Sequence, residues 1–202
     1  MREFIYFSSK ARTSGNFDDL MQAGRMDIVC HVIINAFFLS RHMRDDSILH
    51  LIFYGPPTPP VHLEMHSSTN NIPETGSEVG SLDISKKDVA NVIKKMLYKC
   101  KPGKKTEVWK GYYAEKKNLF DLINELKEKG KEIYILDKDG EDIRKANFEK
   151  DNAVFLIGDH DGLPSKELKR LKQECNLISV GNKMYFASQV MTILNNEIDR
   201  KG

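Results

Sequence analysis

The sequence predicts an α/β fold in which a mostly parallel sheet is flanked by helices. Short apolar runs alternate along the chain with longer segments whose apolar residues recur at helical spacing. Several of these runs end in turns rich in glycine, proline or aspartate. Strands that alternate with helices in this way favour a parallel sheet covered by helices on both faces.

The first half of the chain is expected to begin with a strand over residues 4–8 and a helix over 26–43. The apolar residues of this helix are spaced for burial on one face: Ile28, Val32, Ala36 and Leu39. Two further strands are expected over 47–55 and 61–66, and a Gly-Pro-Pro turn ends the first of them.

A polar segment rich in turn formers, residues 67–81, is predicted to be a loop and is the likeliest place for an insertion. Ser85 and Asp88 have the spacing of a capping box, which predicts a helix from there to about Cys100. The segment KPGKK, residues 101–105, is predicted to be a turn.

The second half of the chain has a more regular pattern. Residues 107–113 fit either a strand or an extended loop. The elements expected after it are a helix over 119–129 closed by Gly130, a strand over 132–136 followed by a DKDG turn, a strand over 153–157, a helix over 165–175, a strand over 176–180 and a final helix over 186–200. The sequence shows neither an internal repeat nor a domain boundary, which predicts one domain over residues 1–202.

The composition is typical of a globular protein. The chain has 202 residues, of which 40% are hydrophobic and 30% charged. No apolar run approaches the ~18 residues of a membrane helix, and the N-terminus lacks the features of a secretory signal. Three widely spaced cysteines, Cys30, Cys100 and Cys175, fit free thiols in a reducing compartment. We therefore expect a cytoplasmic protein with no membrane partner.

Metal-binding motifs fail on inspection. With Gly162 at the sixth position of an EF-hand loop, Ile157 and Leu168 would occupy positions that need carboxylates. The segment HLEMH places His62 and His66 around Glu64, but it lacks both the spacing of a zincin and the cysteine pair of a nucleobase deaminase. Phosphate-binding glycine motifs and a nucleophile elbow are also missing. No metal site is expected.

Three of the predicted strands end in sharp loops, namely DKDG after Leu136, GDHDG after Ile157 and GNKMYFAS after Val180. Ligands of open α/β sheets bind outside the carboxyl ends of the strands, so these loops could line one pocket. Gly158 and Gly181 would let the backbone approach a ligand, and apolar walls would come from Leu136, Ile178, Val180 and Met184. Such a slot suits a flat, partly apolar molecule such as an adenine ring. The alternative is that the glycines only turn the chain.

The order strand–LIGDHDGLP–helix followed by NLISVG and a C-terminal helix resembles the last two motifs of the SPOUT class of RNA methyltransferases. The segments GRMDI and LSRHMRDD resemble, more narrowly, the archaeal tRNA (pseudouridine-54 N1)-methyltransferases, the TrmY family. This resemblance implies a trefoil knot in about residues 130–202, S-adenosylmethionine as the cofactor and tRNA as the substrate. It also implies a homodimer, for which the helices over 26–43 and 186–198 are candidate interfaces or parts of the core.

The same resemblance implies the residues that contact the cofactor. Carried over by position, they are Leu136, Gly158, Leu177, Ile178, Ser179, Val180, Gly181, Met184 and Val190. One departure concerns residues 186–190, FASQV, where relatives often carry a histidine and a cysteine. A catalytic thiol is therefore not expected there.

The chemistry implied by the resemblance needs a proton acceptor, because N1 of pseudouridine carries a proton that methylation must remove. Asp27 fits that role, and Arg25 could steady the developing negative charge on the base. Asp159 is a second candidate base. The alternatives are that Asp27 matches the helix dipole and that Asp159 caps its loop.

RNA binding would have to depend on a local basic patch, because the formal net charge is only +2. The candidate contacts are Arg12, Arg41, Arg44, Lys104 and Lys105, the last two belonging to a lysine run that could equally be a solvated helix face.

Two other functions remain open at this stage. One is a pseudouridine N1-methyltransferase of small-subunit ribosomal RNA, and the other is a non-catalytic RNA-binding assembly factor.

Overall fold

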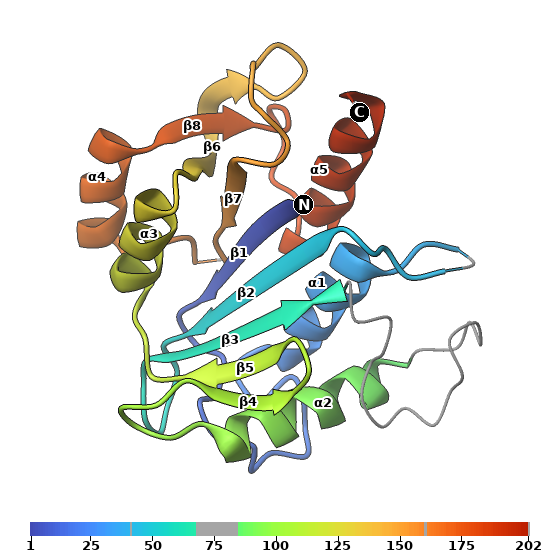
Figure 1. The fold of residues 1–202 in the computed structure, drawn as a ribbon, viewed down its shortest axis with the longest axis vertical. Helices are drawn as coiled ribbons and strands as arrows, with labels where there is room; N and C mark the ends of the chain where they lie inside the picture. The colour runs from blue at the N-terminus through green and yellow to red at the C-terminus, as the bar shows by residue number, and fades with distance from the viewer. Residues whose placement is uncertain (41, 68–84, 160, 202) are drawn as a thin grey trace.

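A computed structural model describes residues 1–40, 42–67, 85–159 and 161–201 of the chain. Its core is an eight-stranded sheet with strand order β4-β5-β3-β2-β1-β7-β6-β8, shown in Figure 1. The strands are β1 (Arg2–Ser8), β2 (Ser47–Phe53), β3 (Val61–His66), β4 (Thr106–Trp109), β5 (Tyr112–Glu115), β6 (Glu132–Asp142), β7 (Ala153–Ile157) and β8 (Asn176–Ser179). The helices are α1 (Met26–Phe37), α2 (Lys86–Lys99), α3 (Leu119–Glu128), α4 (Ser165–Glu174) and α5 (Ala187–Lys201).

The sheet combines a parallel part with an antiparallel extension. Strands β2, β1, β7, β6 and β8 run parallel to one another. Strands β3, β5 and β4 follow β2 in antiparallel order. The prediction of a mostly parallel sheet flanked by helices is therefore confirmed.

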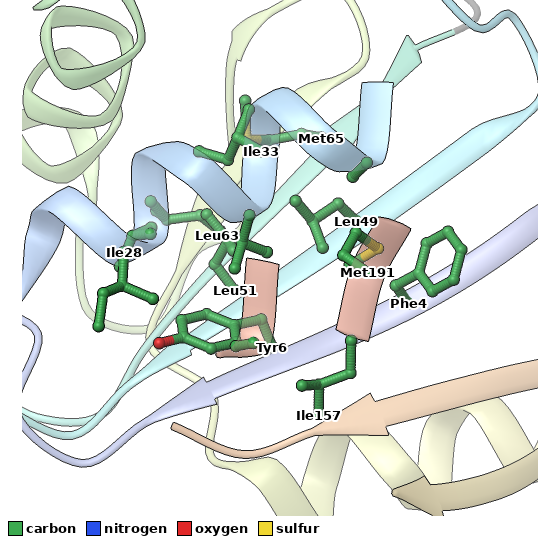
Figure 2. Packing of buried hydrophobic residues seen from close by; sticks show 14 of the residues in the cluster. Phe4, Tyr6, Ile28, Ile33, Leu49, Leu51, Leu63, Met65, Ile157 and Met191 are labelled. Atoms are coloured by element: carbon green, nitrogen blue, oxygen red, sulfur yellow. The ribbon is translucent and has the colours of Figure 1, made fainter. Parts of the chain in front are cut away.

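Alternate side chains of the central strands point to opposite faces of the sheet, and different helices cover each face. Phe4 and Tyr6 of β1 belong to a cluster with the apolar faces of α1, α2 and α5. Ile5 and Phe7 of the same strand pack with α3 and α4. Figure 2 shows Tyr6, Leu51 and Leu63, from three neighbouring strands, gathered beneath α1. Burying each such side chain contributes roughly 1.5–3 kcal/mol to folding, so this packing holds the layers together.

Helix α1 ends earlier than its sequence pattern suggests. The predicted helix over 26–43 stops at Phe37, because Phe38 takes an extended conformation and its N–H bonds the carbonyl of Ile34. Phe38 then pairs with Met43 in an antiparallel bridge. Leu39, which was expected on the buried face, is 38% exposed. The apolar spacing continued past the point where the chain leaves the helix.

Two other segments differ from prediction in their extent. Residues 107–113 form the hairpin β4–β5, whose turn contains Gly111 at φ 79°. Strand β6 runs past the expected 132–136 to Asp142.

The capping box of α2 is confirmed, since Ser85 and Asp88 bond each other's backbone N–H. Apart from Ser67, the predicted loop over 67–81 lies outside the described residues.

Arg44 takes a structural role in place of the predicted RNA contact. Arg44 is only 9% exposed, and its guanidinium donates to both carboxylate oxygens of Asp199 on α5, at 2.9 and 2.6 Å. Buried Arg2 of β1 donates to the same Asp199 and to Asn195. These bonds fasten the C-terminal helix beside the start of β1, as the positions of the two termini in Figure 1 show.

The sequence expectations about thiols and membranes also have structural counterparts. Cys30, Cys100 and Cys175 are all free, with Cys30 buried in the core. Among the described residues, no helix has the length and apolarity needed to cross a membrane.

Candidate functional site

A cavity of about 440 Å³ lies at the carboxyl ends of β6, β7 and β8, where open α/β sheets bind their ligands. The loops that follow these strands form its walls, and α1 and α5 contribute Ile28 and Val190. The remaining lining residues are Leu136, Asp137, Lys138, Asp139, Ile157, Gly158, Asp159, Asp161, Gly162, Leu163, Leu168, Lys172, Ser179, Val180, Gly181, Lys183, Met184, Tyr185, Phe186 and Ala187.

The loop after the first part of β6 closes around β8. Ile178 pairs with Leu136 on one side and with Glu141 on the other, because β6 bends away and returns between these two residues. Gly140 lies at the closest approach, where an added Cβ would stand 2.5 Å from the backbone nitrogen of Ile178. Only a residue without a side chain fits here, so Gly140 lets the first wall of the cavity form.

The loop after β7 is tied to the end of β1 by Asp159. One carboxylate oxygen of Asp159 accepts from the backbone N–H and the hydroxyl of Ser9, at 2.7 and 2.9 Å. The other accepts from the N–H of Asp161, whose own carboxylate lies 2.5 Å from the ammonium of Lys10. Asp159 therefore positions the second wall, in agreement with the alternative that it caps its loop.

The loop after β8 exposes an apolar rim. Gly181 has φ 126°, a conformation that favours glycine. Met184, Tyr185 and Phe186 are 91%, 44% and 62% exposed although all three line the cavity. Gln189 accepts a bond from the N–H of Phe186 at 3.0 Å and so holds this rim at the start of α5.

Most of the residues predicted to contact the cofactor meet at this cavity. Those that line it are Leu136, Gly158, Ser179, Val180, Gly181, Met184 and Val190. Ile178 and Leu177 do not line it. Ile178 is fully buried in the α1–α5 layer, and Leu177 faces the layer of α3 and α4, because successive residues of a strand point to opposite faces.

Charged residues that the sequence pattern missed also line the cavity. Asp137 and Lys172 form an ion pair of 2.6 Å, with Lys138 and Lys183 along the same wall. Burial alone would raise the pKa of Asp137, but the hydrogen bond from Lys172 brings it below the usual value. An apolar cavity with both charges on its wall can receive a ligand that has an aromatic part and a zwitterionic part. The signal that could have indicated Asp137 is its place directly after the strand expected over residues 132–136.

Asp27 and Arg25 lie together at the start of α1. Arg25, at φ 64°, precedes the helix and donates to both oxygens of Asp27 at 3.0 Å. This bond lowers the pKa of Asp27. Burial raises the pKa of Tyr6, and the charges of Asp159 and then Asp27 raise it further. With Ile28 in the cavity wall, Asp27 stands at the same end of the sheet as the cavity.

The predicted RNA contacts differ in their burial and in their partners. Arg12 is half-buried, and its Nε is one of the buried atoms without a partner among the described residues. Lys104 is exposed in the turn after α2. Lys105 bonds Glu64 at 2.6 Å and lies over the ring of Tyr113. Arg41 lies outside the described residues.

No metal-ligating cluster is found at the cavity. Within the described ranges, the histidine, cysteine and carboxylate side chains that line it do not bring three ligand atoms together.

Comparison with known proteins identifies the family of the chain. A family model for SAM-dependent RNA methyltransferases matches residues 1–202. The chain is 37% identical to the tRNA (pseudouridine(54)-N(1))-methyltransferase of Methanococcus aeolicus, over 99% of this chain and 98% of that protein. It is 35% identical to the enzyme of the same name from Methanococcoides burtonii, over 99% and 96% of the two chains.

A solved structure supports the fold. The crystal structure of Archaeoglobus fulgidus Nep1 bound to S-adenosylhomocysteine matches with a TM-score of 0.58 and 14% sequence identity, covering 98% of this chain and 97% of that one. At this identity the likeness establishes the architecture, which is that of the SPOUT methyltransferases. The threading that would make the chain a knot stays a prediction.

Replacing Gly140 by alanine tests the wall around β8. We expect Gly140→Ala to weaken binding of S-adenosylhomocysteine by about tenfold or more, because its Cβ would displace the backbone of Ile178. Isothermal titration calorimetry measures the effect. Gly103→Ala is the control, since that turn has open space around it and the change adds only the strain of φ 69°. Equal affinities of Gly140→Ala and wild type would contradict this account of the cavity.

Proposed function

The chain belongs to the family of SAM-dependent RNA methyltransferases, and from that premise we propose that it methylates N1 of the pseudouridine at position 54 of tRNA. The observation that carries the proposal is end-to-end similarity, at 37% identity, to an enzyme named for that activity. The cavity at the ends of β6, β7 and β8 supports it, because seven predicted cofactor contacts line that cavity.

The cavity fits S-adenosylmethionine by its chemistry. Leu136, Val180 and Leu163 offer apolar surface for an adenine ring, and the backbone next to Gly158 is open to its polar edge. Asp137 and Lys183 offer charges of both signs for the amino and carboxylate groups of the methionine part. When bound, the cofactor supplies an electrophilic methyl group on a sulfonium.

The residues at the start of α1 are proposed to carry the proton transfer. Methylation forms a bond between N1 and the methyl carbon, and the proton on N1 must leave. An aspartate is ionised at neutral pH, and Arg25 lowers the pKa of Asp27 further. The oxygens of Asp27 keep lone pairs beyond those that Arg25 occupies. Arg25 can turn part of its guanidinium toward the carbonyl oxygen that gains charge as the proton leaves. Asp159, whose oxygens already accept three bonds, is assigned to positioning the loop.

Contacts with tRNA are proposed for Arg12 and Lys104. Arg12 is half-buried, so part of its side chain can reach a phosphate oxygen. Lys104 is exposed and adds positive charge after α2. Lys105 can join them only by leaving Glu64, so its contribution would be smaller. Binding through such contacts weakens as salt concentration rises.

The remaining parts of the proposal concern the domain organisation, the knot and the cellular location of the chain. We assign it one domain over residues 1–202, with a knot in the part that carries β6, β7, β8 and α5. Free cysteines and an RNA substrate favour a cytoplasmic location.

A homodimer is proposed from the rim of the cavity. The apolar faces of α1 and α5 pack on each other and on the sheet, and Asn35 bonds Ser188 and Asn195 between them, so these faces are core. Met184, Tyr185 and Phe186 are three consecutive exposed apolar residues at the rim of the cavity. A partner that covers it would also complete the cavity wall.

The mass of the protein in solution tests the dimer. We expect light scattering to give twice the chain mass of 23.2 kDa for wild type. Phe186→Asp should shift the mass toward that of one chain, because a charge at a buried apolar contact opposes association. Exposed Asp45→Asn is the control. A wild-type mass of one chain at all concentrations would overturn the dimer.

Methyl transfer to defined RNAs tests the function itself. With labelled S-adenosylmethionine, we expect label to enter a tRNA transcript that carries pseudouridine at position 54 and not the same transcript with uridine there. The nitrogen that accepts the methyl is present as N–H only in pseudouridine. If the protein binds cofactor but labels neither transcript, the tRNA proposal is wrong. Transfer to small-subunit ribosomal RNA would then identify the other methyltransferase, and no transfer to any RNA would identify a binding module.

Changing Asp27 tests the proposed base. We expect Asp27→Asn to lower kcat by about 100-fold or more, the size of a general-base contribution, and to leave the Kd for S-adenosylhomocysteine within about twofold. Single-turnover kinetics on the pseudouridine transcript measure the loss. Asp18→Asn is the control, because that carboxylate is fully exposed. An unchanged kcat in Asp27→Asn would remove Asp27 from the reaction.

A further inference from the structure

A line of buried polar side chains crosses the sheet far from the cavity. Glu3 of β1, His50 of β2, His62 of β3 and Glu115 of β5 succeed one another on four neighbouring strands. His50 is 3% exposed and His62 is fully buried. Glu3 stands at the N-terminal end of β1, whereas the cavity lies beyond the carboxyl ends of the parallel strands. The methyl-transfer proposal uses none of these residues.

Hydrogen bonds connect the four side chains in series. Nε2 of His50 lies 2.9 Å from a carboxylate oxygen of Glu3, and Nδ1 of His62 lies 3.0 Å from one of Glu115. Between the rings, Nδ1 of His50 is 2.9 Å from Nε2 of His62. Lysines pair with both outer carboxylates, Lys131 with Glu3 and Lys117 with Glu115, each at 2.8 Å.

This series fixes where the ring protons are. Carboxylates that are paired with lysines are ionised and only accept hydrogen bonds, so the outer nitrogen of each ring carries N–H. The inner nitrogens of His50 and His62 then face each other at a distance where two lone pairs repel. A single cation between the two nitrogens, either one shared proton or a metal ion, would satisfy both of them.

A third ligand stands beside the two inner nitrogens. The Oε2 atom of Glu64 lies 4.0 Å from Nδ1 of His50, and the three ligand atoms lie within 4.8 Å of one another. Two imidazoles and one carboxylate are a ligand set of Zn²⁺, whereas Ca²⁺ and Mg²⁺ favour oxygen ligands. Metal-binding histidines typically donate their second ring N–H to a carboxylate, and Glu3 and Glu115 accept those two bonds here.

An ion could enter past Glu64. Its side chain is 13% exposed, and the ammonium of Lys105, 2.6 Å from Oε2, belongs to a side chain that is 38% exposed. Lys105 can swing into solvent and leave that oxygen to the ion. The inner nitrogens would separate to about 3.3 Å, the spacing of two ligands on a tetrahedral zinc, which is a small movement from 2.9 Å.

We propose that His50, His62 and Glu64 bind one Zn²⁺ ion in place of the proton between the two rings. Glu3 and Glu115 hold the rings in orientation, and a water completes the coordination. The ion cross-links β2 to β3 directly and reaches β1 and β5 through the outer carboxylates. It stabilises the antiparallel side of the sheet and takes no part in methyl transfer.

The sequence pattern alone could not indicate this site. Within HLEMH, the spacing of His62, Glu64 and His66 fits no zinc motif. The missing ligand, His50, comes from the neighbouring strand, where the sheet register sets it beside Glu64. His66 bonds Glu64 at 2.8 Å and orients it.

Zinc binding to the full-length, untagged protein tests the proposal. After removal of metal with a chelator, we expect titration with zinc sulfate to show one site per chain with a Kd of micromolar or below, and Tm to rise by about 5 °C at saturation. Glu64→Gln should weaken binding by tenfold or more, and Glu3→Gln by about 10–100-fold through the loss of ring support. His31→Gln, on the exposed side of α1, is the matched control and should bind zinc as wild type does.

Two results would overturn the site. Folded wild-type protein that binds no zinc at about 100 μM would show that a proton alone joins the rings. Binding that is unchanged in Glu64→Gln and in His62→Ala would show that the ion lies elsewhere. The wild-type titration decides the question even if a variant fails to fold. Because the site lies away from the cavity, neither result depends on the outcome of the methyl-transfer assay.

Discussion

The close contact between Gly140 and the backbone of Ile178 is the constraint on which the candidate site depends. It lets β6 leave and rejoin β8, so that Leu136 and Glu141 lie on either side of Ile178. The edge strand is thereby held from two sides. The loops that follow β6 and β8 then face the loop after β7, and the cavity forms among them.

Interactions at both ends of β1 fix the layers around this cavity. Asp159 joins the end of β1 to the loop after β7 through Ser9, and Arg2 joins the start of β1 to α5 through Asp199. Helix α5 in turn packs against α1, whose first turn carries Asp27. The proposed base and the proposed cofactor pocket are therefore parts of one packed unit. Their relative position is set by these part-buried bonds and by the packing of α5 against α1.

The sequence predicted the features that depend on local pattern and missed those that depend on neighbouring strands. Apolar periodicity and turn residues located the α/β order and the three cavity loops, because both signals lie within one segment. The end of α1 was missed because Leu39 keeps the helical spacing after the chain has turned. The partners of Arg44 and Lys172 could not be read from the sequence, since Asp199 and Asp137 lie far away along the chain. His50 beside Glu64 likewise needs the sheet register.

The central claim is that one cofactor binds among the three loops at the carboxyl ends of β6, β7 and β8. Hydrogen–deuterium exchange with and without S-adenosylhomocysteine tests it most directly, because it reports where binding protects the backbone. The account predicts protection in residues 136–142, 157–164 and 178–187, and none in the hairpin β4–β5. Protection confined to other segments, or no protection despite measured binding, would contradict it.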